Sequence, residues 1–148
     1  GLGDVYKRQQ ESRMTSMQNL VQKLLNKQGS VFDLANGTNL AATFRKAAAN
    51  ADPDTIKAAQ EAISDDGYWG IKQTSDRMVS MAIALTGGDT DKADEMISAI
   101  EKGFKQATKS LGEDLPDICQ KTLEETKKKM NDWKNGVTTA ADYSDYLS

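Results

Sequence analysis

The sequence predicts an all-α protein, folded as a compact antiparallel helical bundle with a loosely ordered N-terminal region. Three observations lead to this prediction. Apolar residues recur at spacings of three and four through most of the chain, and short glycine-containing segments separate these stretches. No run of alternating β-branched residues bounded by turns indicates a strand. The chain has 148 residues, of which 38% are hydrophobic, and this is enough for one modest core.

The N-terminal region is expected to be loosely attached. Its first nine residues, GLGDVYKRQ, look like translated sequencing adapter, so we predict that residues 1–13 are artefactual or disordered. A short helix is expected to follow, because a narrow apolar stripe precedes Gly29 and consists of Met14, Met17, Leu20, Val21, Leu24 and Leu25. Gly, Ser, Asn and Asp then become frequent from Gln28 to Asn39. Residues 14–38 are therefore predicted to be a short helix and a linker, where any domain boundary lies.

Residues 39–136 are predicted to form the helical bundle domain. Its first helix is expected in the alanine-rich residues 40–49. Asp52 can cap the orphan amides of the next helix, and Pro53 suits the first helical position, where a missing amide hydrogen is no loss. These signals predict a helix at 53–63.

A broad apolar arc predicts that the helix at 72–86 is the central one, with Asp76, Arg77 and Ser80 on the opposite side. The pair Gly87-Gly88 is expected to end this helix. Glycine accepts the left-handed conformation of a helix C-cap at little steric cost, so the chain can turn back here.

The cleanest amphipathic stripe predicts a helix at 90–111, capped by Asp89 or Thr90. Its apolar positions are Ala93, Met96, Ile97, Ile100, Phe104, Ala107 and Leu111. Gly103 inside this helix should cost about 1 kcal/mol relative to alanine, so we expect another backbone to approach it closely. A last helix is predicted at 117–135, ending at Asn135-Gly136, and the tail at 137–148 is expected to be loose.

Composition argues against several classes of protein. Nineteen Lys and Arg against 22 Asp and Glu give a net charge of −3 with mixed signs, which argues against nucleic acid as the main partner. The chain has no histidine and a single cysteine, which removes Ser-His and Cys-His nucleophile pairs, internal disulfides and multi-thiolate zinc sites. No apolar run reaches the ~20 residues that a membrane-spanning helix needs. We therefore expect a soluble, cytoplasmic protein with no catalytic residue, cofactor or metal.

The loop between the helices at 53–63 and 72–86 contains the candidate partner contact. Its carboxylates around Asp65, Asp66 and Gly67 invite comparison with a calcium-binding EF-hand, but no register supplies the required ligands, so a helix-helix turn is favoured. Tyr68 and Trp69 follow, and aromatic residues often dominate protein interfaces. The alternative is that the rings cap the core. This alternative is favoured for Trp69, whereas Tyr68 is the better surface candidate.

Four further features each have a structural and a functional interpretation. Cys119 lies in the middle of its helix stripe, where burial would raise its pKa and make it inert. The three lysines at 127–129 could suggest an anionic partner, but a solvated helix face is favoured. The six methionines are favoured as core residues over a promiscuous binding groove. Two of the 22 carboxylates could meet as a catalytic pair, although nothing singles out a pair.

Three segments follow one another along the chain: SDDGYWGIKQTSDRMVSMAIALTGGD, EKGFKQA and LPDICQKT. In this order they resemble a group of short uncharacterised bacterial proteins, some of which carry the label hydrogenase-four component G. The resemblance covers roughly residues 63–133, and its most specific parts are GYWG with TSDR, the GGD hinge and LPDI. It implies a bacterial helical domain without established catalytic residues, so no functional residue is transferred. The hydrogenase label finds no support, because the chain has no clustered cysteines and no histidine.

The leading functional prediction is a non-enzymatic interaction module whose partner is another protein. The layout of a loose N-terminal region before a helical domain adds the expectation of a link to a bacterial surface or flagellar assembly. One alternative is a small hydrolase or lyase that uses carboxylates alone, in which three or more acidic side chains should gather in a pocket. A second alternative is a chaperone-like bundle that binds a client helix through its methionines, and burial of Met78, Met96 and Met130 would dispose of it.

Overall fold

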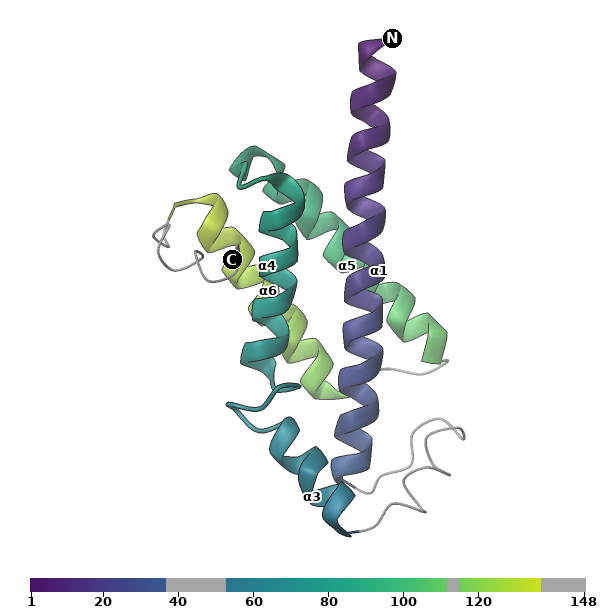
Figure 1. The fold of residues 1–148 in the computed structure, drawn as a ribbon, viewed down its shortest axis with the longest axis vertical. Helices are drawn as coiled ribbons and strands as arrows, with labels where there is room; N and C mark the ends of the chain where they lie inside the picture. The colour runs from purple at the N-terminus through teal and green to yellow at the C-terminus, as the bar shows by residue number, and fades with distance from the viewer. Residues whose placement is uncertain (37–52, 112–114, 137–148) are drawn as a thin grey trace.

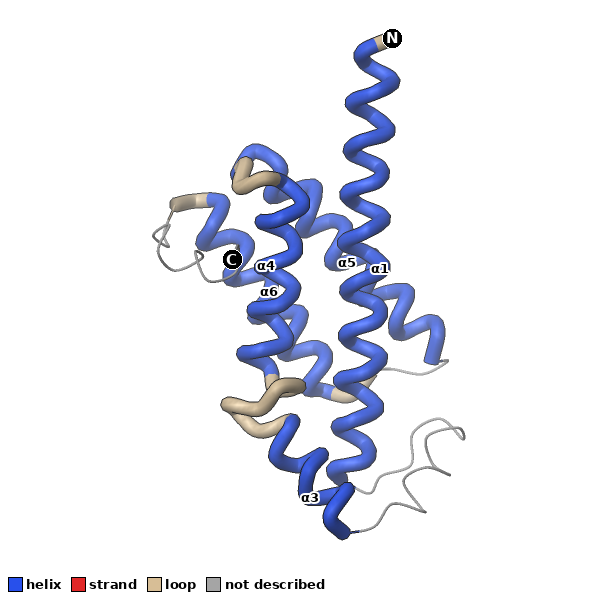
Figure 2. The backbone as a smooth tube through the Cα atoms, in the orientation of Figure 1, coloured by secondary structure: helices blue, strands red, loops and turns tan. Residues whose placement is uncertain are grey.

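The structure is a computed structural model that describes residues 1–36, 53–111 and 115–136. Within these ranges the regular elements are all helices, and no described residue forms a strand (Figure 2). The elements are α1 (Leu2–Asn36), α3 (Pro53–Ala62), α4 (Ile71–Thr86), the 3₁₀ helix η1 (Thr90–Lys92), α5 (Ala93–Leu111) and α6 (Asp117–Lys134). The predicted all-α fold is therefore confirmed.

The four helices predicted at 53–63, 72–86, 90–111 and 117–135 are present with nearly the same ends. Three other predictions concern residues outside the described ranges: the helix at 40–49, the cap by Asp52 and the tail at 137–148. Among the described helices, none combines the length and the hydropathy that crossing a bilayer requires.

Figure 1 shows α1 running along most of the height of the molecule, with its N-terminal turns projecting beyond the other helices. Consecutive helices α4, α5 and α6 alternate in direction, as short hinges require. In contrast, α3 and α4 run in the same general direction, and α3 packs against α1. The loop at 63–70 therefore joins these two helices without reversing the chain.

The glycine pair between α4 and α5 ends the helix as predicted. Gly87 and Gly88 have φ values of 64° and 84°, in the left-handed region that side chains disfavour. The Gly88 amide donates to the Ile83 carbonyl (3.0 Å) and the Gly87 amide to the Ala84 carbonyl (3.2 Å), which is the Schellman pattern. Asp89 then caps η1, since its side chain accepts from the Asp91 amide at 3.0 Å. This turn sends α5 back across the bundle.

The predicted linker at 28–38 is wrong for the part that the structure describes, because α1 continues through it to Asn36. Gly29 does not end the helix. A Cβ at this position would lie 3.6 Å from Pro116 Cδ and 3.7 Å from Cys119 Sγ, so the glycine faces the start of α6 in ordinary contact. The buried residues of this segment are Gln28, Gly29, Asp33 and Ala35. Their tertiary packing outweighs a local preference for loop, and α1 belongs to the bundle.

The beginning of α1 also differs from the prediction that residues 1–13 are artefactual or disordered, because the helix starts at Leu2. Residues 1–12 are exposed. Arg13, in contrast, forms a bidentate ion pair with Glu95 of α5 (Nε to Oε2 3.0 Å, Nη2 to Oε1 3.1 Å). The hydrogen bond to Glu95 raises the pKa of the Arg13 guanidinium. Packing of α1 against the bundle therefore begins at Arg13, and the adapter origin of GLGDVYKRQ stays a prediction.

One buried cluster joins α1, α4, α5 and α6. Met17, Met78, Met96 and Met130 are fully buried in it, which confirms the core interpretation for four of the six methionines. The other large side chains that are fully buried include Val21, Leu25, Val79, Ile83 and Ile100. Flexible methionine side chains suit the irregular space between helices that cross at different angles.

The closest approach of two helices occurs where α5 crosses α1 at Gly103. A Cβ on Gly103 would lie 2.6 Å from the Gln18 carbonyl oxygen and 2.7 Å from Val21 Cβ. Neither atom is the far end of a flexible side chain, so the space cannot be opened without moving a backbone. The predicted close approach of another backbone at Gly103 is therefore confirmed, and α1 packs more extensively on α5 than on any other described helix.

We expect Gly103→Ala to lower the free energy of unfolding by about 1–2 kcal/mol. Overpacking typically costs about 1–3 kcal/mol, and the cost here should be about 2–3 kcal/mol because the added Cβ would meet a backbone oxygen and a branched Cβ. The better helix propensity of alanine offsets about 1 kcal/mol of this. Urea unfolding followed by far-UV circular dichroism measures the change. Gln106→Ala, on an exposed position of the same helix, is the control and should change stability by no more than about 0.5 kcal/mol. A Gly103→Ala protein as stable as the wild type would contradict the packing described here.

The thiol of Cys119 should be inert in the folded protein. It is fully buried, its Sγ donates to the Leu25 carbonyl at 3.5 Å, and burial raises its pKa to about 12. Because the thiolate is the reactive form, a thiol reagent at about pH 8 should modify the native protein at least about a hundredfold more slowly than the urea-unfolded chain.

The same shift predicts the sign of a pH dependence. The folded thiol has the higher pKa, so its contribution to stability is fully present below pH 9.0, the ordinary value, and is lost progressively as pH rises towards about 12. Urea midpoints measured between neutral and alkaline pH test this, with Cys119→Ala as the control that removes the group. Rapid modification of the native protein would show that the thiol is accessible.

Candidate functional site

The loop between α3 and α4 is built on close backbone contacts. The amide of Gly67 donates to the Ser64 carbonyl at 2.9 Å, and the amide of Trp69 donates to the Ala62 carbonyl at 2.7 Å. A Cβ on Gly67 would overlap the carbonyls of Glu61 and Ala62, and one on Gly70 would overlap the Ser64 carbonyl. Only glycine fits at these two positions, so the sequence GYWG fixes the path of the loop and the place of its two aromatic residues.

Tyr68 and Trp69 lie against each other and against Arg77 of α4. The two rings meet edge to face, with centroids 5.1 Å apart and an interplanar angle of 85°. The guanidinium carbon of Arg77 lies 3.8 Å from the Tyr68 ring centroid and 4.9 Å from that of Trp69. A partly desolvated cation over aromatic faces contributes about 1–2 kcal/mol. We call these three residues the Arg77 cluster.

Hydrogen bonds hold Arg77 in this position. Its Nη2 donates to the Tyr68 carbonyl at 2.6 Å and to Thr74 Oγ1 at 3.3 Å. Burial lowers the pKa of the guanidinium, and the aromatic faces stabilise its charge where water is partly excluded. The sequence pattern placed Arg77 opposite the apolar arc of α4, and the structure shows that its guanidinium is half-buried against the two rings of the loop.

The two aromatic residues differ in exposure. Tyr68 is 56% exposed, which agrees with its prediction as the better surface candidate. Trp69 is half-buried and does not belong to the buried core cluster, so the preferred core interpretation holds only in part. Its ring is occupied by contacts within the Arg77 cluster.

A buried glutamine of α1 fastens the loop to the bundle. Gln28 Nε2 donates to the Trp69 carbonyl at 2.9 Å and to Thr122 Oγ1 of α6 at 2.8 Å. Gln28 is fully buried, so these bonds replace contacts with water that it has lost. It was predicted to lie in a linker, although it continues the spacing of Val21 and Leu25 on α1. That periodicity is the sequence signal that could have found it.

An apolar groove begins beside the Arg77 cluster and follows the line between α1 and α4. Its volume is about 310 Å³, and it is lined by Leu20, Leu24, Arg77, Ser80, Met81 and Ala84. Leu20, Leu24 and Met81 are half-buried and Ala84 is exposed, so the groove is open to solvent. We call it the α1–α4 groove. Because Arg77 belongs to both, the groove and the Arg77 cluster form one continuous surface.

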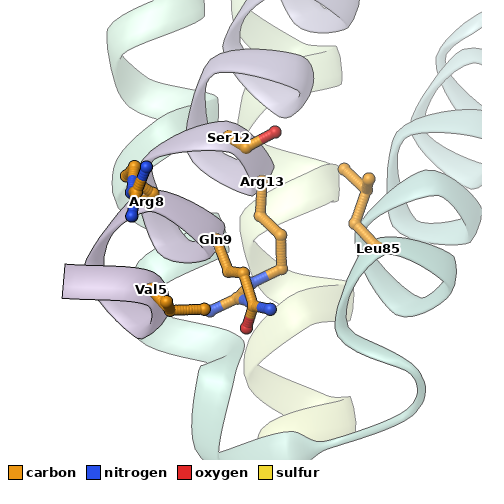
Figure 3. A pocket seen from close by; sticks show the side chains of 6 residues that line it. All are labelled: Val5, Arg8, Gln9, Ser12, Arg13 and Leu85. Atoms are coloured by element: carbon orange, nitrogen blue, oxygen red, sulfur yellow. The ribbon is translucent and has the colours of Figure 1, made fainter. Parts of the chain in front are cut away.

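A larger hollow of about 630 Å³ lies at the projecting end of α1 and is lined by Val5, Arg8, Gln9, Ser12, Arg13 and Leu85. Figure 3 shows Leu85 of α4 facing the side chains of α1 across it. Arg13 is already paired with Glu95. Three of the lining residues fall in the segment that resembles sequencing adapter, so we base no function on this hollow.

The carboxylates that the structure describes do not gather into a ligand set. Among the described residues, no group of three or more Asp, Glu or Cys side chains could hold a metal ion. The acidic loop at Asp65 and Asp66 fits the interpretation as a helix-helix turn, since both residues are exposed and the loop is closed by backbone hydrogen bonds. The described residues thus lack the acidic pocket that would favour a carboxylate hydrolase or lyase.

The lysine run at 127–129 is a solvated face only in part. Lys128 is exposed, but Lys127 pairs with Glu101 of α5 at 3.1 Å and Lys129 pairs with Asp76 of α4 at 2.6 Å. These lysines link helices, and the prediction of a solvated face is wrong for two of the three. The spacing within α6 alone could not show this, because both partners lie on other helices.

Burial of the methionines bears on the chaperone-like alternative. Met78, Met96 and Met130 are each 0% exposed. A client helix cannot contact side chains that the bundle itself covers, so these three methionines do not support this alternative.

Comparison of the chain with protein-family models, with curated proteins and with solved structures gave no match.

Proposed function

We propose that this protein is a non-enzymatic helical module that binds another protein through the Arg77 cluster and the α1–α4 groove. The observation that supports this most strongly is that Arg77 belongs both to the Arg77 cluster and to the lining of the α1–α4 groove. Its guanidinium lies 3.8 Å from the ring centroid of Tyr68, and its side chain also lines the apolar groove. Aromatic, cationic and apolar groups thus adjoin on one open surface.

The composition of this surface is typical of protein interfaces. Binding energy at interfaces is concentrated in Trp, Tyr and Arg residues, and Met is enriched there relative to the rest of the surface. Tyr68 is the one exposed large hydrophobic residue that the structure describes outside the first turns of α1. The rigid loop around Gly67 and Gly70 holds it in place, so little side-chain and loop freedom remains to be lost on binding.

The carboxylate hydrolase or lyase lacks an acidic pocket among the described residues. The link to a bacterial surface or flagellar assembly stays a prediction, because no described contact bears on it.

The proposal is tested by photo-crosslinking from the position of Tyr68. A photoreactive phenylalanine derivative replaces Tyr68 in the chain expressed in bacterial cells, and the crosslinked protein is identified by mass spectrometry. The purified partner should then bind Tyr68→Ala at least about tenfold more weakly than the wild type, as expected for an aromatic hot spot. The readout is the dissociation constant from calorimetry.

Two controls make the test specific. The photoreactive residue at Lys121, an exposed position of α6, should not capture the same partner. Tyr6→Ala removes another exposed tyrosine, which is 65% exposed on α1, and should leave the affinity unchanged. If the partner binds Tyr68→Ala as tightly as the wild type, and circular dichroism shows both to be folded, this surface is not the binding site.

A further inference from the structure

Building on the proposed interaction function, we infer that the α1–α4 groove accepts an acidic amphipathic helix of a partner protein. Two features of the described residues lead to this occupant. One is the shape of the apolar floor, and the other is the charge along its edges.

The apolar floor has the spacing of helix packing. Leu20 and Leu24 are four residues apart on α1, and Met81 and Ala84 are three apart on α4, so each pair projects from one face of its helix. A groove between two packed helices suits a third helix that inserts residues at i, i+3, i+4 and i+7. The half-exposed lining and the volume of about 310 Å³ fit a row of side chains better than an enclosed small molecule.

The α1 edge of the groove carries only cations. On the α4 side Arg77 lies in the lining, next to Asp76, which pairs with Lys129 of α6. Lys23 and Lys27 each follow a groove leucine by three residues on α1, which places them along its edge, and both are exposed. The chain has no Asp or Glu between Glu11 and Asp33. This edge is positive in a chain whose net charge is −3.

The acidic residues near the groove are engaged or lie beyond it. Asp76 is the single acid of α4; it pairs with Lys129 of α6 at 2.6 Å and also acts on the charge of its neighbour Arg77. Asp65 and Asp66 belong to the loop beyond Tyr68. Carboxylates flanking the apolar face of a partner helix would therefore meet Lys23 and Lys27 along the α1 edge, where no acid of α1 opposes them.

The described helices of a second copy would make poorer occupants. Their exposed large apolar residues are Leu2, Val5 and Tyr6 at the start of α1, and Lys7 and Arg8 follow them directly. Docking this segment would place cations against the cations of the groove, which costs affinity. A partner of opposite charge is favoured.

The inference is tested with a displayed library of peptides of about 18 residues, long enough to form a helix. Leucines are fixed at alternating spacings of three and four, and each flanking position encodes glutamate or lysine with equal frequency. Selection on the wild-type protein should enrich glutamate over lysine by at least about threefold at the flanking positions.

Single selected peptides are then measured by fluorescence anisotropy. Met81→Glu should weaken binding about tenfold or more, because it puts a charge on the apolar floor. Lys27→Glu should weaken it about threefold or more, whereas Lys121→Glu, the same change on an exposed position of α6, should not. Circular dichroism confirms that each variant is folded.

The outcomes separate this inference from the proposed function. If lysine is enriched, or neither residue is, while Met81→Glu still abolishes binding, the groove binds a helix but the acidic occupant is wrong. If no peptide binds, the inference fails, and the crosslinking experiment at Tyr68 decides separately on the interaction function. If sedimentation shows a dimer that Met81→Glu dissociates, the occupant is a second copy and the inference is overturned.

Discussion

The contact on which the rest of the structure depends is the crossing of α1 and α5 at Gly103. Two helix backbones can come this close only where one of them has no side chain, and any added atom meets the Gln18 carbonyl and the branched Val21. The cost of a glycine inside a helix is about 1 kcal/mol, and it is offset by the apolar area that α1 and α5 bury along their extended contact. Without this approach, α1 would lose its most extensive contact with the other described helices.

The position of α1 in turn determines the candidate site. Once α1 lies along the bundle, Gln28 reaches both the loop at Trp69 and α6 at Thr122. The loop then presents Tyr68 to Arg77, and Leu20 and Leu24 form one wall of the groove. A helix that the sequence marks as peripheral therefore supplies half of the surface proposed to bind a partner.

The contrast between the predicted and the observed structure has a physical explanation. The helices from Pro53 to Lys134 were predictable, because apolar periodicity and the Gly87-Gly88 stop are local signals, and Gly103 and Cys119 could be interpreted from their position on a stripe. The extension of α1 beyond Gly29 was not predictable in this way. There the local signal for a turn is overridden by contact with Pro116 and Cys119, which lie almost 90 residues away.

In the candidate site, too, local features could be predicted from the sequence, whereas contacts between distant segments could not. Tyr68 and Trp69 were found because aromatic residues in a loop stand out in a sequence. Arg77 and Gln28 were missed, since a cation over a ring and a buried amide between three segments are relations in space that no single helix pattern contains. The groove was also missed, because its two walls come from helices far apart in the sequence.

The ion pairs of Lys127 and Lys129 have a consequence for the orientation of α6. Two residues apart on a helix, the side chains point in nearly opposite directions, and they reach Glu101 on α5 and Asp76 on α4. Each pair contributes little free energy by itself. Together they resist rotation of α6 about its long axis, because such a rotation moves both ammonium groups away from their carboxylates. The two ion pairs thereby fix the rotational orientation of α6 relative to α5 and α4.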